Sequence, residues 1–257
     1  MNKYFLLILA ASFIVAGCSS GIKITSQPPA AAAVIDGDVS EWSNMTQIKN
    51  ENLAFSFSND DKFLYVAMVT GDRRKMMRIM AGGLQVWLEP DNTAEKFGVL
   101  YPEPPDPAEI RKQLEERMAR GEERRPDPQR FRRAHNKLFI LNSEEARLEE
   151  FPSDGATYQA RLEADRDRLA YELRIPIGAD INPPAGLQVK PGESIKVRFI
   201  TGEIMPFGPG GDMPQMSGGE GPPMGGGRPG MGGRGGMGGR PEMEFKPFDF
   251  EFNVKLN

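Results

Sequence analysis

The stretch "YQARLEADRDRLAYELRIPI", residues 158–177, decides the fold class of this chain. In its first half, Tyr158, Ala160 and Leu162 share one face of an extended chain, and polar residues occupy the other face. After a polar turn at 166–167 the alternation resumes, with inward positions at Leu169, Tyr171, Leu173 and Ile175 and outward positions at Glu172 and Arg174. A period of two with one apolar face predicts two antiparallel strands that each bury a single side.

The same alternation recurs in "SIKVRFIT" (194–201) and in "FDFEFNVKL" (248–256). By contrast, "FLYVAMVTG" (63–71) is apolar on both faces, which predicts a more central strand. Several short strands with turn signals between them, and almost no helical periodicity, predict an all-β chain folded as an antiparallel β-sandwich. An antiparallel barrel is the alternative that the pattern leaves open.

Two long segments depart from this pattern. Residues 102–136 contain "DPAEIRKQLEERMAR", in which Asp106 suits an N-cap and Pro107 the first helical position. We therefore expect a charged helix at 107–120, with a narrow apolar stripe, in a solvated insertion. Residues 205–243 are dominated by Gly and Pro and hold seven of the 14 Met residues. This composition predicts a disordered Gly/Pro/Met-rich loop between the last two strands.

The N-terminus has the pattern of a secretory signal, with one Lys, an apolar run and small residues. It ends in "VAGC", which resembles the lipobox of bacterial lipoproteins, a family in which the cysteine is lipidated and becomes the first mature residue. Cys18 is the only cysteine of the sequence, so it has no disulfide partner. We therefore expect a signal peptide at 1–17, a lipid anchor on Cys18, a short tether at 18–33 and a folded domain at 34–257.

The charge of the mature chain bears on its partners. Residues 1–17 contribute one Lys to the net charge of −4, so the mature chain would carry −5. This leaves no basic excess for nucleic acid or anionic lipid. No second apolar run of membrane length follows, so membrane attachment depends on the lipid alone. In the lipoproteins that the N-terminus resembles, Ser19 is not an inner-membrane retention signal, which implies the outer membrane, facing the periplasm.

The folded domain opens with "VIDGDVSEW" (34–42), whose acidic residues raise the question of a calcium loop. Asp36, Asp38 and Ser40 fit positions one, three and five of an EF-hand loop. Position six should be Gly and is Glu41, and position twelve should be Glu and is Gln47. The EF-hand interpretation therefore fails.

Five blocks of the sequence occur in the order seen in one family. They are "VIDGDVSEW", "NDDKFLYVAMVTGD", "GLQVWLEPD", "LAYELRIPIGAD" and "ESIKVRFITGE". Together they resemble the family 9 carbohydrate-binding modules and their DOMON-like sandwich relatives, over about residues 34–101 and 155–257, with both insertions outside the match. The resemblance implies a β-sandwich, a tight turn at Asp36-Gly37 and a core position for Trp42.

The resemblance also implies a sugar site, because in these modules aromatic rings flank the sugar and polar side chains bond its hydroxyls. In "GLQVWLEPD", alternation places Trp87 on the polar face with Gln85 and Glu89. These three residues are the candidate carbohydrate-binding residues, with the Trp87 ring as a stacking platform. The alternative is that the helix at 107–120 or a neighbouring loop covers Trp87. No second exposed aromatic is evident for a two-ring clamp.

Metal sites are a further set of hypotheses. Related modules hold structural calcium through loop carboxylates, and Asp60, Asp61 and Asp91 offer such oxygens, although ordinary turns use the same residues. Met213 and Met216 form Met-x-x-Met, whose thioethers suit Cu(I), although Met is also a common filler in such loops. Some DOMON-like relatives bind haem, but the only His lies in the charged insertion.

No motif for catalysis is found. The sequence has no Ser/His/Asp order and no metal-binding His pair, and we expect no enzyme and no cofactor, calcium aside. The first functional hypothesis is a lipid-anchored sandwich that binds polysaccharide or oligosaccharide without turnover. The second is a structural or assembly lipoprotein that contacts a protein partner through its two insertions.

Overall fold

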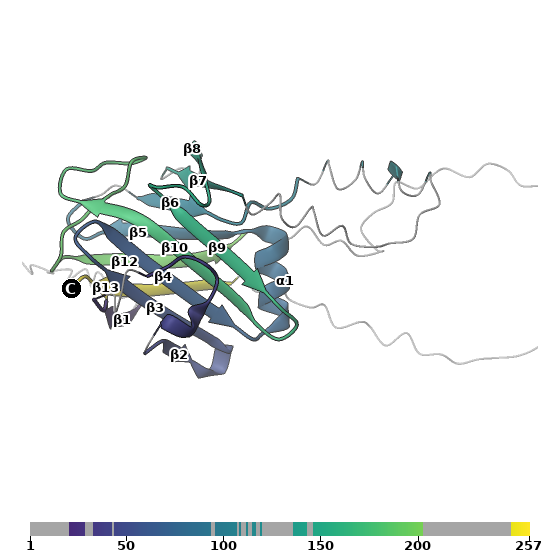
Figure 1. Ribbon diagram of the computed structural model, residues 1–257, viewed down its shortest axis with the longest axis horizontal. Coiled ribbons are helices and arrows are strands. Elements are labelled where there is room, and N and C mark those ends of the chain that lie inside the picture. The colour runs from purple at the N-terminus through teal and green to yellow at the C-terminus, as the bar shows by residue number, and fades with distance from the viewer. Residues whose placement is uncertain are drawn as a thin grey trace, which may run out of the picture.

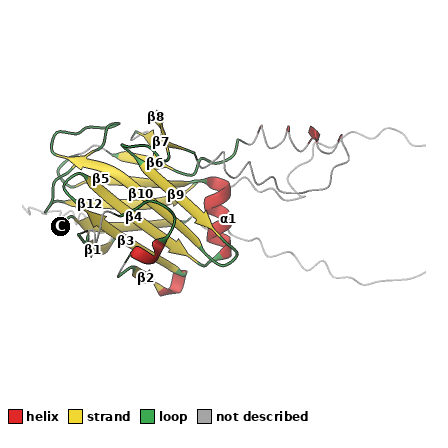
Figure 2. Cartoon of the chain, in the orientation of Figure 1, coloured by secondary structure: helices red, strands yellow, loops and turns green. Residues whose placement is uncertain are grey.

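The computed structural model describes residues 21–28, 33–42, 44–93, 96–106, 136–142, 146–202 and 248–257, and the single positions 108, 112, 115, 116 and 119. Its strands form two sheets that lie one in front of the other (Figure 1). Strands dominate the described chain, and the α-helix α1, Arg73–Gly82, stands at one end of the two layers (Figure 2). The predicted β-sandwich is therefore confirmed, and the single closed sheet of a barrel is not formed.

The first sheet has seven strands, in the order β1-β13-β12-β5-β6-β7-β8. Their bounds are β1 Ile22–Thr25, β5 Leu84–Pro90, β6 Phe97–Leu100, β7 Lys137–Leu141, β8 Arg147–Pro152, β12 Ser194–Thr201 and β13 Asp249–Lys255. All neighbours are antiparallel except β1 and β13, which are parallel.

The second sheet has six strands, in the order β11-β10-β4-β3-β2, with β9 also paired to β10. Their bounds are β2 Thr46–Ile48, β3 Leu53–Asn59, β4 Phe63–Thr70, β9 Gln159–Ala164, β10 Leu169–Gly178 and β11 Leu187–Gln188. The short pair β10–β11 is parallel, and the other pairs are antiparallel. The sandwich is thus antiparallel apart from one parallel pair in each sheet. As the sequence predicts, β4 is central, between β3 and β10.

The core lies between the two sheets and is made of the inward positions that alternation predicts. Phe55 of β3 contacts rings from the opposite sheet, with its centroid 4.8 Å from that of Phe199 on β12 and 4.5 Å from that of Phe252 on β13. All three side chains are buried, as are Tyr158, Ala160 and Leu162. Burial of these apolar faces is the main force that holds the two sheets together.

The prediction of a tether at 18–33 is wrong for residues 22–25. These form β1, which pairs with β13 residue for residue, and Ile24 packs against the core. The chain then crosses toward the other sheet, where the Gln27 N–H donates to the Phe57 carbonyl oxygen at 2.9 Å. The alternation Ile-Lys-Ile-Thr is strand-like, and the polar composition around it obscures that signal.

The α-helix α1, Arg73–Gly82, was not expected from the sequence. The Asp72 carboxylate caps it, because it accepts the N–H groups of Arg74 at 2.8 Å and Lys75 at 3.3 Å. Met76 and Ile79, three residues apart, bury the inner stripe of the helix. A cap, this spacing and the Gly pair at 82–83 were the available signals.

The two insertions lie largely outside the described residues. Within the helix expected at 107–120, positions 108, 112, 115, 116 and 119 are helical and exposed. The Asp106 carboxylate accepts the N–H of Ala108 at 2.8 Å, which agrees with its predicted role as N-cap. The loop expected at 205–243 is not described at all. Over the part of the chain that is described, no helix is long and apolar enough to span a membrane.

Candidate binding site

The opening loop, residues 34–42, is held by a buried carboxylate from a strand that lies 130 or more residues later in the sequence. Glu172 of β10 is 0% exposed and lies under this loop. It accepts the N–H of Gly37 at 2.6 Å through Oε2 and the indole N–H of Trp42 at 2.6 Å through Oε1. A buried carboxylate is tolerated only with such donors, so the loop and the strand depend on each other.

The sequence pattern places Glu172 on a solvated outer face, and this prediction is wrong. Its outward direction is correct, but the opening loop covers it and removes its water. Burial raises the pKa of Glu172 above its ordinary value, and the hydrogen bonds from Gly37 and Trp42 oppose that rise.

The other acidic residues of the opening loop bond to the loop itself. Asp36 accepts the N–H of Asp38 at 2.8 Å, and Asp38 accepts the N–H of Ser40 at 2.9 Å. The hydrogen bond from Ser40 lowers the pKa of Asp38. The predicted turn at Asp36-Gly37 is present: Gly37 has a φ of +93°, and a Cβ there would overlap the Glu163 side chain. These contacts are those of a turn.

Trp42 is buried, as predicted, but it packs outside the six-stranded sheet and not between the sheets. It forms the Trp42 cluster with Val39, Tyr65, Ala67 and Ala170. The two alanines are short side chains that leave room for the indole over β4 and β10. The apolar outer face of β4 is therefore explained by a loop that covers it.

Trp87 is not the exposed platform that a stacked sugar would need. Its direction away from the main core is correct, because Leu84, Val86 and Leu88 face inward. However, the ring is only 6% exposed and packs with Leu100, Phe139 and Leu141. Gly98 on β6 leaves the space for it, since a Cβ there would approach the ring carbons to 2.9 Å. Side chains of β6 and β7 therefore cover the ring that was expected to stack on a sugar.

The two polar partners expected beside Trp87 are also occupied. The Trp87 indole N–H donates to the Gln85 side chain at 2.9 Å. Glu89 pairs with Lys96 at 2.8 Å and lies 3.7 Å from Lys196. On the outer face of the seven-stranded sheet, Gln85 is thus bonded to Trp87, and Glu89 is paired with two lysines.

The calcium candidates are not brought together. Asp60 accepts the N–H groups of Lys62 and Phe63 at 2.8 and 2.7 Å, and the Tyr65 hydroxyl at 2.8 Å, so it closes the β3–β4 turn. Across the described ranges, no three His, Cys, Asp or Glu side chains lie close enough to hold a metal ion. Asp61 and Asp91 therefore join no such group. Cys18, Met213 and Met216 lie outside the described residues.

A concave site lies at the β2 edge of the six-stranded sheet, and no motif in the sequence indicates it. The β2 pocket, of about 310 Å³, is lined by Gln47, Ile48, Lys49, Asn52, Leu53, Ala54, Val69 and Gly71. Gln47, Ala54 and Val69 are successive cross-strand partners, so they share the outer face of the sheet. The short Ala54 between two longer side chains makes the hollow.

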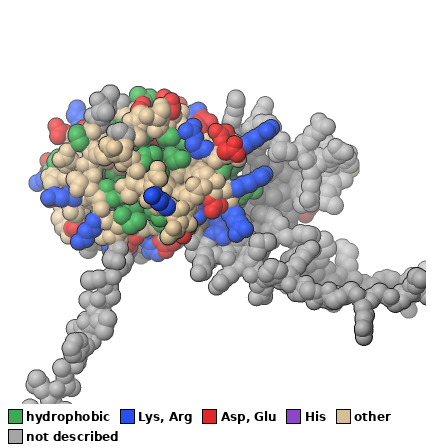
Figure 3. All heavy atoms as spheres, turned by 90° about the horizontal axis from the view of Figure 1, so that it is seen from below, with side chains coloured by type: hydrophobic (Ala, Val, Ile, Leu, Met, Phe, Trp, Pro, Cys, Tyr) green, Lys and Arg blue, Asp and Glu red, His purple; other side chains and the backbone are tan. Residues whose placement is uncertain are grey.

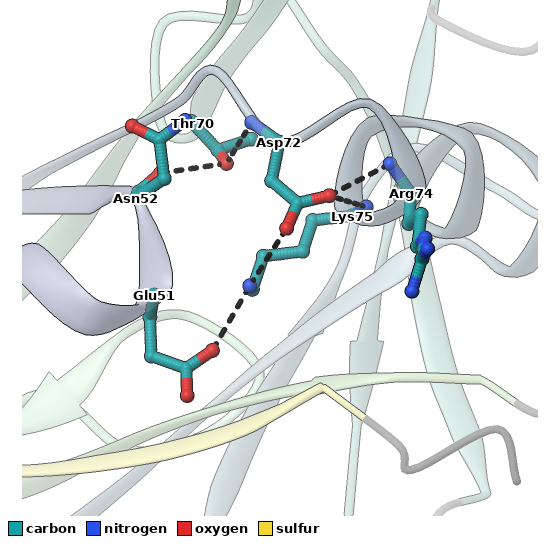
Figure 4. A network of polar contacts seen from close by, with 6 residues as sticks. All are labelled: Glu51, Asn52, Thr70, Asp72, Arg74 and Lys75. Atoms are coloured by element: carbon teal, nitrogen blue, oxygen red, sulfur yellow. Dashed lines mark hydrogen bonds and ion pairs between the residues drawn. The ribbon is translucent and has the colours of Figure 1, made fainter.

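The wall of the β2 pocket toward α1 is fixed by a polar network (Figure 4). Thr70 donates its hydroxyl to the Asn52 carbonyl oxygen at 2.9 Å and accepts the Asp72 N–H at 3.1 Å. Lys75 then bridges Asp72 at 3.2 Å and Glu51 at 2.9 Å. The 3₁₀-turn η2, Lys49–Glu51, is thereby held against the first turn of α1.

Asn52 completes this wall through an unusual backbone. It has a φ of +51°, a left-handed conformation that Asn adopts more readily than most residues. Its side chain lies close to Gly71, where an added Cβ would come within 3.0 Å of Nδ2. The left-handed backbone at Asn52 and the absence of a side chain at Gly71 thus allow the Asn52 amide its place at the rim of the β2 pocket.

The buried Glu172 predicts a specific dependence of stability on pH. Its folded-state pKa lies above the ordinary value of 4.5, so the folded protein binds this proton more tightly than the unfolded chain. The resulting stability is fully present below pH 4.5 and is lost as the pH rises through the folded pKa. In Glu172→Gln this slope, at most about 1.4 kcal/mol per pH unit, should vanish.

Urea unfolding of both proteins at a series of pH values measures the effect. The difference in free energy of unfolding, wild type minus Glu172→Gln, should fall as the pH rises. Glu149→Gln is the matched control, because Glu149 is exposed and should leave the slope unchanged. Parallel curves for wild type and Glu172→Gln would contradict the burial of an ionisable group here.

The covered state of Trp87 predicts weak quenching of its fluorescence. Trp42→Phe leaves Trp87 as the single emitter, and acrylamide should quench it several-fold less than a free indole. The reciprocal variant, Trp87→Phe, should behave alike, because Trp42 is only 9% exposed. Quenching of Trp87 at the rate of a free indole would restore the platform hypothesis.

Comparisons with known proteins were made for the whole chain. No family model and no curated protein matches it. Two solved structures of a family 9 carbohydrate-binding module from Caldicellulosiruptor kristjanssonii, with glucose and with cellotriose, are 14% identical, at a TM-score of 0.33. They cover 71% and 70% of this chain, and 78% and 75% of their own. A candidate carbohydrate-binding protein from Bacteroides uniformis is 9% identical at a TM-score of 0.37, over 71% of this chain and 84% of that one. At these values the similarity assigns neither a family nor a ligand.

Proposed function

We propose that this chain is a non-catalytic carbohydrate-binding protein of the bacterial cell envelope, and that the β2 pocket takes one unit of a polysaccharide or oligosaccharide. One observation carries the proposal: amide side chains from Gln47 and Asn52 stand beside an aliphatic floor of Ala54 and Val69. The pocket lies on the outer face of a sheet, where a long polymer has access.

The chemistry of this lining suits a sugar. An amide side chain both donates and accepts hydrogen bonds, as a hydroxyl group requires, whereas a carboxylate only accepts. The aliphatic floor suits the C–H face of a pyranose ring. A volume of about 310 Å³ is at the lower end of the range of about 300–1,000 Å³ for ligand pockets, which favours a single sugar unit.

Two further observations support binding without turnover. Of the five sequence blocks that resemble the family 9 modules, the first forms the opening loop and the other four lie, in order, on β4, β5, β10 and β12. Lys49 is the only ionisable residue of the described pocket lining. The lining therefore has no pair of Asp or Glu side chains to serve as acid and base in glycoside hydrolysis. The polar groups of the β2 pocket can therefore hold a sugar, but the lining lacks the two carboxyl groups that glycoside hydrolysis uses.

The second candidate is a structural or assembly lipoprotein that contacts a protein partner through residues 102–136 and 205–243. The covered position of Trp87 favours it, because the aromatic ring expected for sugar stacking is not free. Under this hypothesis the β2 pocket would be a surface irregularity with no ligand.

The proposed envelope location depends on lipidation of Cys18, with the outer membrane, facing the periplasm, as the expected site. Metabolic labelling with radioactive palmitate in a bacterial host should mark the wild-type chain. Cys18→Ser should abolish the label and release the protein from the membrane fraction. Label that persists in Cys18→Ser would overturn the anchor.

Filling the β2 pocket should abolish glycan binding without unfolding the protein. Ala54 is partly exposed on the outer face, so Ala54→Leu adds its extra atoms to the pocket and not to the core. We expect the affinity for whichever glycan binds to fall at least about tenfold, or about 1.4 kcal/mol. The measurement is calorimetric titration of full-length protein in detergent against plant, algal and bacterial oligosaccharides.

Two milder variants test the amides, and one controls for the substitution. Gln47→Ala and Asn52→Gly should each weaken binding several-fold, about 1 kcal/mol, and Gly keeps the left-handed backbone at 52. Ala146→Leu is the matched control, an exposed Ala just before β8 on the other sheet. If the wild-type protein binds none of these glycans, the proposal of a carbohydrate-binding function is contradicted and the protein-partner hypothesis is favoured.

A further inference from the structure

The lining of the β2 pocket contains one charged group, Lys49, which is exposed. Within the described part of the chain, no carboxylate forms an ion pair with it. Glu51 and Asp72, the two acids of the polar network beside the pocket, are bound by Lys75 at 2.9 and 3.2 Å. The Lys49 ammonium therefore has no carboxylate partner among the described residues.

The surroundings of the β2 pocket add to this positive charge. Arg73 and Arg74 follow closely after Gly71 of the pocket lining and are exposed, and no described carboxylate pairs with either. Figure 4 shows the Arg74 side chain pointing away from Asn52, so it acts through its field and not by contact. Figure 3, which views the molecule from below Figure 1, shows Lys and Arg side chains at the α1 end, with Asp and Glu side chains among them.

This basic region contrasts with the acidic balance of the whole chain, which has a net charge of −4. The positions are also unfavourable for the helix: Arg73, Arg74 and Lys75 place three cations in the first turn of α1, at the positive end of its dipole. A local excess of cations on an acidic protein attracts anionic ligands over a distance of about one Debye length, roughly 10 Å at 0.1 M salt.

Resting on the proposed function, we infer that the β2 pocket recognises an acidic sugar unit, a uronate. Its carboxylate pairs with Lys49, and its hydroxyl groups bond to the amides of Gln47 and Asn52. Its ring lies over Ala54 and Val69. The ligand class is therefore an acidic polysaccharide or oligosaccharide and not a neutral glucan.

The test compares each acid with its own methyl ester, because the ester keeps every ring hydroxyl and removes only the charge. Oligogalacturonate, oligomannuronate and oligoglucuronate of three units, and the methyl ester of each, are titrated into the full-length protein in detergent. At least one acid should bind about tenfold more tightly than its ester. The preference should shrink as NaCl is raised from 0.05 to about 0.5 M.

Variants at Lys49 connect this preference to the pocket. Lys49→Gln should bring the acid down to the affinity of its ester, and Lys49→Arg should retain the preference. Lys62→Gln is the matched control, an exposed lysine in the β3–β4 turn, and should change nothing. Circular dichroism melting of each variant checks that the fold is intact, because Lys49 is exposed and its loss should not unfold the protein.

The outcomes separate this inference from the function on which it rests. If acid and ester bind equally tightly and Ala54→Leu binds neither, the inference of an acidic ligand is overturned. The proposal that the β2 pocket binds carbohydrate then stands. An acid preference that survives Lys49→Gln would also overturn the inference, by placing the charge recognition elsewhere. No binding of acids, esters or neutral oligosaccharides would overturn both.

Discussion

The buried carboxylate of Glu172 joins the opening loop to strand β10. Glu172 accepts the backbone N–H of Gly37 and the indole N–H of Trp42, which precede it by 135 and 130 residues. Removing either donor would leave one oxygen of this desolvated carboxylate without its hydrogen bond, a cost of about 1–3 kcal/mol. The opening loop is therefore fixed over the outer face of β4 and β10, and Trp42 covers a surface that would otherwise expose apolar residues to water.

The β2 pocket follows from that arrangement. Met45 packs against the Trp42 cluster just before β2 begins, so the anchored loop also directs β2 onto the edge of β3. Val69 contacts the same cluster and forms part of the pocket floor. On the far side, Lys75 holds η2 through Glu51. The hollow thus lies between two anchored segments, and its amides are presented by a rigid frame, which lowers the entropic cost of binding.

The sequence was sufficient for the sandwich, because the alternation in residues 158–177, 194–201 and 248–256 reports directly which side chains are buried. It was also sufficient for the direction of Trp87, but not for its exposure, which depends on Gly98 and Phe139 from neighbouring strands. The burial of Glu172 depends on a loop far away in the sequence. The β2 pocket depends on the register that sets Ala54 between Gln47 and Val69, and no local pattern encodes that register.

The first strand, β1, shortens the segment that joins Cys18 to the folded domain. With β1 paired along β13 from Ile22 onward, Cys18 lies only four positions before the folded sheet. Four residues span at most roughly 14 Å, whereas a free segment from Cys18 to Ala33 would have reached roughly 50 Å. A lipid on Cys18 would therefore hold the β1 edge of the sandwich near the bilayer surface and restrict the tumbling of the domain. Under the proposed function, a glycan would then be bound close to the membrane surface.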